Sequence, residues 1–84
     1  MRLRQNDLTW QVVGDDVVVL DLGGSVYLRV NGSGRVLWEA LAAGAGEAEL
    51  AGALVERFGI DAAQAGADVD AFLTDLRARG LVEE

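Results

Sequence analysis

Two segments within the first thirty residues alternate apolar and polar side chains with a period of two. Residues 8–12 follow this alternation, and residues 25–30 repeat it. Between them, residues 17–22 are β-branched and apolar apart from Asp21. Period-two alternation is typical of a strand with one buried face, and a continuous apolar run is typical of a buried central strand. The pattern therefore predicts three consecutive antiparallel strands with residues 17–22 in the centre.

Two short polar or glycine-rich links separate these runs. Residues 14–16, Gly-Asp-Asp, have the composition of a turn, and Gly23 and Gly24 form the second link. Both of these glycines can adopt a positive φ, which a two-residue hairpin with primed turn geometry requires. We therefore predict a tight hairpin at Gly23–Gly24, followed by a third strand at residues 25–31.

The predicted third strand has an apolar face and a polar face. Its apolar side chains are Val26, Leu28 and Val30, and the opposite face carries Ser25, Tyr27 and Arg29. The apolar face is expected to pack on helices. Because this strand ends the meander, its outer edge has no partner, and an open edge is a place where another chain can add a strand.

After residue 31 the apolar period changes to that of a helix. Asn31 or Ser33 is the expected N-cap of a first helix, which ends at Gly44. Residues 47–58 form the second predicted helix, with Gly59 directly after its end. The residues expected in the core between these elements are Trp38, Leu41, Leu54 and Phe58.

A third helix begins at Asp61. Asp61 and Gln64 have the spacing of a capping box, and Gly80 closes the helix. Gly66 lies inside it and costs ~1 kcal/mol relative to alanine, so its first turn is expected to fray or to form a separate turn. The apolar stripe of this helix consists of Ala65, Val69, Phe72, Leu73 and Leu76. The order of elements predicts an α+β fold, a three-stranded antiparallel β-meander followed by three α-helices, similar to a winged helix-turn-helix.

Length and composition limit the function classes. A chain of 84 residues forms one domain, here 1–84, and it contains no cysteine, histidine or lysine. Disulfide scaffolds, thiolate metal sites and Cys/His catalysis are therefore excluded. The net charge of −7 disfavours binding to nucleic acids and anionic membranes. The first residues lack the apolar core of a signal peptide, so we expect a soluble cytoplasmic protein.

No constellation of residues points to catalysis or to a cofactor. Ser25 and Ser33 have no histidine or lysine to activate them, and the carboxylates are scattered. Residues 32–34 and 44–46 are isolated G-x-G fragments without a phosphate-binding fingerprint, and caps or turns explain them. We expect no enzyme activity, no metal and no cofactor.

Two further interpretations remain open on the pattern alone. A winged helix-turn-helix can bind DNA, but its recognition helix needs a basic face, and the third helix carries Asp68, Asp70 and Asp75 against Arg77 and Arg79. The open third strand can instead pair with its own copy and form a homodimer.

The ordered sum of these motifs resembles the PqqD-like family of peptide-recognition domains. The segments that carry the resemblance are the strand 17–22 with its Gly-Gly link, residues 27–34 with Trp38 four residues on, residues 50–59, and residues 69–82. Each motif is a short apolar pattern, and the resemblance as a whole covers nearly the whole chain. A member of this length looks most like the small recognition protein of lasso-peptide biosynthesis. The alternative is a peptide chaperone of pyrroloquinoline quinone biosynthesis or of another pathway for ribosomally made, modified peptides.

The resemblance implies binding to the leader segment of a ribosomally made precursor peptide. The leader would add as a strand along the third strand, with its side chains against the third helix, and a separate leader peptidase and a macrolactam-forming cyclase would do the chemistry. Arg29, Arg77 and Arg79 would pair with acidic leader residues, and Asp68 or Asp75 with basic ones. The residues implied in leader binding are Val26, Tyr27, Leu28, Arg29, Val30, Asp68, Val69, Phe72, Leu73, Asp75, Leu76, Arg77 and Arg79.

Overall fold

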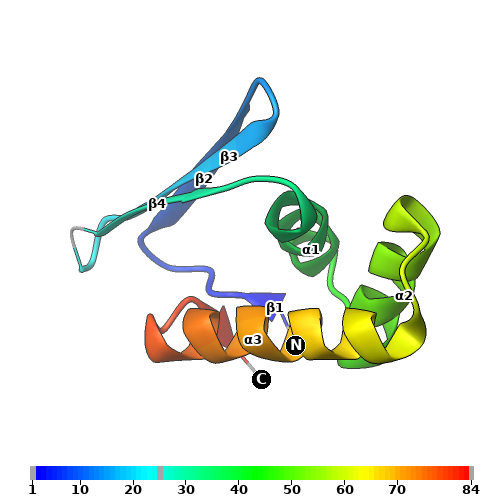
Figure 1. The fold of residues 1–84 in the computed structure, drawn as a ribbon. Helices are drawn as coiled ribbons and strands as arrows, with labels where there is room; N and C mark the ends of the chain where they lie inside the picture. Colours follow the sequence, from blue (N-terminus) through cyan, green and yellow to red (C-terminus); the bar gives the residue numbers. More distant parts are fainter. Residues whose placement is uncertain (1, 25, 84) are drawn as a thin grey trace.

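The computed structural model describes residues 2–24 and 26–83, and it places a small sheet on one side of a group of helices (Figure 1). The element order is β1 (Arg2–Leu3), β2 (Leu8–Val13), β3 (Asp16–Asp21), β4 (Val26–Val30), α1 (Ser33–Ala42), α2 (Glu47–Phe58), α3 (Ala62–Ala78) and β5 (Val82–Glu83). Strands β2, β3 and β4 form an antiparallel sheet with β3 in the centre. The predicted α+β class and the meander followed by three helices are confirmed.

The faces of β3 and β4 follow the predicted pattern, whereas β2, which was predicted to have one buried face, is exposed from Thr9 to Val13 and only partly buried at Leu8. Val17 and Val19 on β3 are buried, and the register places Val30 opposite Val17 and Leu28 opposite Val19. Leu28 and Val30 are partly buried and pack against the core, whereas Tyr27 points to the other face and is 58% exposed. Helix α1 is the element that packs on β3 and β4. Ser25, predicted on the outer face, lies outside the described residues.

The tight hairpin lies at a different link from the one predicted. Gly14 and Asp15 alone connect β2 to β3, and Gly14 has a φ of 62°, as a two-residue hairpin requires. β3 and β4 do form an antiparallel pair, but the predicted two-residue turn at Gly23–Gly24 is wrong, because β3 ends at Asp21, β4 begins at Val26, and Gly23 has no positive φ. The cause is the carboxylate at the end of β3, which accepts hydrogen bonds from the N–H groups of both glycines and folds them into a wider turn.

The helix boundaries agree closely with the sequence pattern, and the caps differ in part. Gly32, not Asn31 or Ser33, is the N-cap of α1. The second helix spans the predicted residues, and Gly59 ends it in the left-handed conformation with a φ of 67°. The N-cap of α2 is Gly46, which lacks the hydroxyl that a Ser or Thr cap would supply. The Gly46 N–H donates to the Glu49 side chain at 3.2 Å, which partly compensates for this lack.

Helix α3 is continuous from its cap to its end. Asp61 accepts a hydrogen bond from the Gln64 N–H at 2.8 Å, but the Gln64 side chain donates to Asp68 instead of completing the capping box. The helix runs without a break through Gly66, so the predicted separate first turn is not observed. None of the helices in the described part of the chain is long and apolar enough to cross a bilayer.

The core contains three of the four residues expected there. Trp38, Leu41 and Leu54 are fully buried. The prediction that Phe58 is a core residue is wrong, since Phe58 is 46% exposed at the last position of α2, where its ring lies against the Arg57 guanidinium. The pattern also missed β1 and β5, which pair with each other antiparallel and join the two ends of the chain.

Candidate functional site

Strand β4 is an edge of the sheet. It pairs with β3 on one side, and no described strand pairs with its other side. Its only charged side chain, Arg29, lies on the outer face and pairs with Asp16 on the neighbouring strand β3 at 2.7 Å. Edges that avoid pairing usually carry several charges, a proline or a bulge. The free edge of β4 therefore retains the capacity to add a strand.

Phe72 brings α3 to the end of β4. A Cβ added at Gly34 would lie 3.4 Å from the Val30 Cβ and 3.6 Å from the Phe72 Cε1, so both side chains border the same small space. Phe72 and Val30 are partly buried and pack against the core, as does Leu28. We call the free backbone edge of β4 with Leu28, Val30 and Phe72 the edge site.

One flank of α3 faces the edge site. Residues three or four apart share a helix face, so Asp68 and Asp75 lie on the flank of Phe72, and Arg79 lies one turn beyond Asp75. Both carboxylates already accept hydrogen bonds within the helix: Asp68 from the Gln64 side chain at 2.8 Å and Asp75 from the Arg79 guanidinium at 3.1 Å. A ligand would have to exchange these contacts for its own.

Three predicted site residues lie in the core instead of on an accessible surface. Val69 is 3% exposed, and Leu73 and Leu76 are fully buried. They form the stripe by which α3 packs on the rest of the protein. A bound chain would reach them only if the helix moved away, so their contribution is to support Phe72 from behind.

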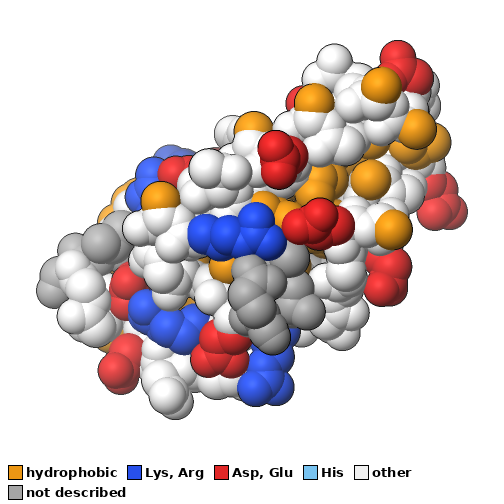
Figure 2. All heavy atoms as spheres, turned by 90° about the horizontal axis from the view of Figure 1, so that it is seen from below, with side chains coloured by type: hydrophobic (Ala, Val, Ile, Leu, Met, Phe, Trp, Pro, Cys, Tyr) orange, Lys and Arg blue, Asp and Glu red, His pale blue; other side chains and the backbone are white. Residues whose placement is uncertain are grey.

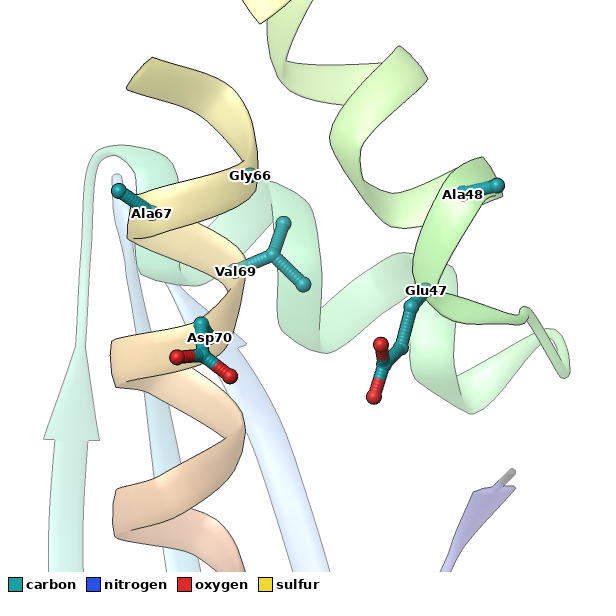
Figure 3. A pocket seen from close by; sticks show the side chains of 6 residues that line it. All are labelled: Glu47, Ala48, Gly66, Ala67, Val69 and Asp70. Carbon is teal, nitrogen blue, oxygen red and sulfur yellow. The ribbon is translucent and has the colours of Figure 1, made fainter. Parts of the chain in front are cut away.

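Arg77 and Val69 face α2, on the other flank of α3. Arg77 pairs with Glu47 at 3.3 Å. Figure 3 shows Val69 directed toward the space between the two helices, with Glu47 and Asp70 beside it. This pocket of about 490 Å³ is lined by Glu47, Ala48, Gly66, Ala67, Val69 and Asp70. The structure therefore separates Arg77 from the edge site, in contrast to the grouping predicted.

The start of β4 is held by a buried carboxylate that sequence reasoning missed. Asp21, 6% exposed, accepts hydrogen bonds from the Arg4 guanidinium and from the N–H groups of Gly23 and Gly24 at 3.1 and 3.2 Å. The Arg4 hydrogen bond holds the pKa of Asp21 below its usual 3.8, against the opposing effect of burial, and the two N–H groups add to the lowering. The sequence did contain a signal for this role, because Asp21 is the one acidic residue in the apolar run of residues 17–22.

Replacing Asp21 by asparagine is expected to destabilise the fold in a pH-dependent way. A folded pKa below 3.8 means that the charged form contributes stability that is complete above about pH 3.8 and is lost as the pH falls toward the folded pKa. Asp21→Asn should therefore be less stable than the native protein at pH 7, and the difference should shrink in strong acid. Urea unfolding at pH 7 and pH 2.5 measures this. The exposed Asp15→Asn is the control, and an equal difference at both pH values would contradict the assignment.

Among the described residues, the side chains on the α3 side form no basic face. Figure 2 views the molecule from below, and the acidic and basic side chains on that face are interspersed. Ion pairs between α3 and α2, and within α3, account for several of them. Duplex DNA is bound chiefly through clustered cations, so this face is poorly suited to it.

A family comparison agrees with this arrangement. Residues 16–82 match the family model described as "Coenzyme PQQ synthesis protein D (PqqD)". The chain belongs to the PqqD family. The matched range contains the whole of the edge site, so the resemblance stated from the sequence is confirmed.

Two solved structures share the fold of this PqqD-family protein over almost its whole length. One, described as "TbiB1 in Complex with the TbiA(beta) Leader Peptide", has a TM-score of 0.91 at 24% identity and covers 99% of this chain and 95% of its own. The other, "Lasso peptide synthetase B1 complexed with the leader peptide", has a TM-score of 0.85 at 23% identity and covers 99% and 96%. At this identity the likeness establishes the fold. No curated protein sequence gave a significant match.

Proposed function

We propose that this PqqD-family protein binds the leader segment of a ribosomally synthesised precursor peptide at the edge site. The leader adds as a fourth strand along β4, and apolar leader side chains contact Leu28, Val30 and Phe72. The observation that carries the proposal is the free, nearly uncharged edge of β4 with Phe72 packed at its end. The two similar structures reported above are both described as leader-peptide complexes, which supports the same class of ligand here.

Affinity and selectivity come from different parts of the site. Main-chain hydrogen bonds along residues 27–29 hold any extended chain in register, and they carry little sequence information. The apolar side chains of the edge site select the anchors, and a few buried anchors usually supply most of the binding energy. Asp68, Asp75, Arg29 and Arg79 select charged leader residues at the rim.

The protein acts as a carrier and itself makes and breaks no bonds. Holding the leader raises the effective concentration of the attached precursor at a partner enzyme. We infer a cytoplasmic lasso-peptide pathway in which a separate leader peptidase and a macrolactam-forming cyclase use the bound precursor. The alternative is a peptide chaperone of pyrroloquinoline quinone biosynthesis, which the description of the matching family favours.

An NMR titration tests the site. Once the neighbouring genes have been searched for a short precursor peptide, the probe is a synthetic peptide spanning its leader, added to ¹⁵N-labelled protein. Amide shifts are expected in β4 and on the α3 flank of Asp68, Phe72 and Asp75. Shifts confined to β2 or to the pocket between α2 and α3 would contradict the site.

Two controls separate the other interpretations. A duplex DNA oligonucleotide at low salt should give no polarisation change, because the net charge is −7. Sedimentation at micromolar concentration should give a monomer, since a homodimer through β4 would occupy the edge that the leader needs.

A further inference from the structure

Arg4 lies between the sheet and the end of α3, and its guanidinium reaches four separate groups. It pairs with the Asp21 carboxylate, and it donates to the backbone carbonyls of Gly80 at 3.1 Å, Asn6 at 3.0 Å and Asp7 at 3.5 Å. The Arg4 main-chain N–H donates to the Leu81 carbonyl at 2.8 Å. One side chain thus connects the end of β3, the chain after β1 and the turn after α3.

Two of these contacts are at the boundaries of the edge site. Asp21 is the register partner of Val26, the first residue of β4, and its carboxylate also holds the turn that leads into that strand. Gly80 follows directly on the end of α3. Arg4 therefore links the start of β4 to the end of α3, two elements on either side of the site.

The other end of the site is tied by Phe72. Phe72 and Val30 both border Gly34, at the end of β4. Val26 and Val30 are about 13 Å apart along an extended strand. From Phe72 to Ala78, the last residue of α3, the helix rises about 9 Å, and Gly80 lies two residues further on. The two contacts are thus spaced similarly on the strand and on the helix, so the two elements are held at both ends while the middle of the strand edge stays free.

We propose that Arg4 is a positioning residue for peptide binding, which sets the separation between β4 and α3 before the peptide arrives. The proposal rests on the proposed function and adds a residue that does not touch the peptide. An edge site fixed in advance loses less conformational freedom on binding, which raises affinity. Arginine suits this role because its planar fork can donate to a carboxylate and to carbonyls at the same time.

Arg4→Met tests the proposal, with Arg2→Met as the matched control. Arg2 lies two residues away, and its ion pair with Glu83 is exposed, with 65% of the arginine side chain accessible. Fluorescence polarisation with the labelled synthetic leader peptide measures the Kd, and far-UV circular dichroism verifies folding. Arg4→Met should bind at least tenfold more weakly, and Arg2→Met should bind within twofold of the native protein. Native affinity in folded Arg4→Met overturns the proposal.

A second readout distinguishes positioning from general destabilisation. In the free protein, Arg4→Met should shift the amide signals of residues 26–28 and 80–81 and leave those of α2 unchanged, whereas uniform shifts would indicate a merely structural role. If Arg4→Met does not fold, Arg4→Lys decides. Lysine keeps the charge at Asp21 but lacks the planar fork, so a loss of fivefold or more supports the proposal and native affinity overturns it. If the native protein itself does not bind the peptide, the proposed function has failed, independently of Arg4.

Discussion

Replacing Phe72 by alanine is expected to weaken leader-peptide binding about 30-fold, which corresponds to ~2 kcal/mol. Phe72 is the one aromatic side chain of α3, and it lies at the end of β4, partly buried beside Val30. A leader strand added to β4 would cover the rest of its ring. Truncation removes this anchor and leaves the backbone edge intact, so the peptide should keep its register and lose residence time.

Phe58→Ala is the matched control for this variant. Phe58 is also a partly exposed phenylalanine on a helix, but it lies at the end of α2 against Arg57 and lines a pocket with Arg35 and Glu39 of α1, and it is not part of the edge site as defined. Its removal should leave the Kd unchanged within twofold. Calorimetric titration with the synthetic leader peptide measures both variants, after circular dichroism has shown that each is folded. Equal Kd values for Phe72→Ala and Phe58→Ala would show that Phe72 does not contribute to peptide binding.

The sequence was sufficient to predict the longer strands and the helices, because their apolar periodicity extends over enough residues to be recognised. Residues 8–12 of β2 and the twelve residues of α2 show their period clearly, and the apolar face of β4 follows directly from its own alternation. Strands β1 and β5 have two residues each, which is too short for any period. The prediction of the turn after β3 failed for another reason. Its shape is set by the Asp21 carboxylate, whose main partner, Arg4, is 17 residues away.

The candidate site was predictable only at the level of the strand. Alternation along a strand decides which side chains share a face, and it correctly placed Leu28 and Val30 together. On α3 the apolar stripe is continuous, and no local pattern distinguishes its buried centre from its accessible flank. The packing of α1 against the sheet makes that distinction, because it leaves Phe72 beside Gly34 and buries Leu73. Such contacts join residues far apart in the chain.

Replacing Trp38 by alanine is expected to destabilise the fold by about 3–5 kcal/mol. Trp38 is fully buried on α1, the helix that contacts both the sheet and α2. Its ring also meets Trp10 on β2 edge to face, with 6.2 Å between centroids and an angle of 79°. A chain of 84 residues has a total stability of roughly 4–13 kcal/mol, so the loss would remove a large part of it.

Two companion variants show whether this effect comes from the core. Trp38→Phe keeps an aromatic ring and removes the indole N–H, which is buried without a hydrogen-bond partner among the described residues, so it should cost less than the alanine change. Trp10→Ala should also cost less, because Trp10 is 37% exposed. Urea unfolding followed by far-UV circular dichroism measures all three without relying on tryptophan fluorescence. If the free energy of unfolding of Trp38→Ala lies within 1 kcal/mol of that of the native protein, Trp38 is not the main contact between the sheet and the helices. The support of β4 by α1 would then have to come from Leu37 and Leu41, the other buried side chains of that helix.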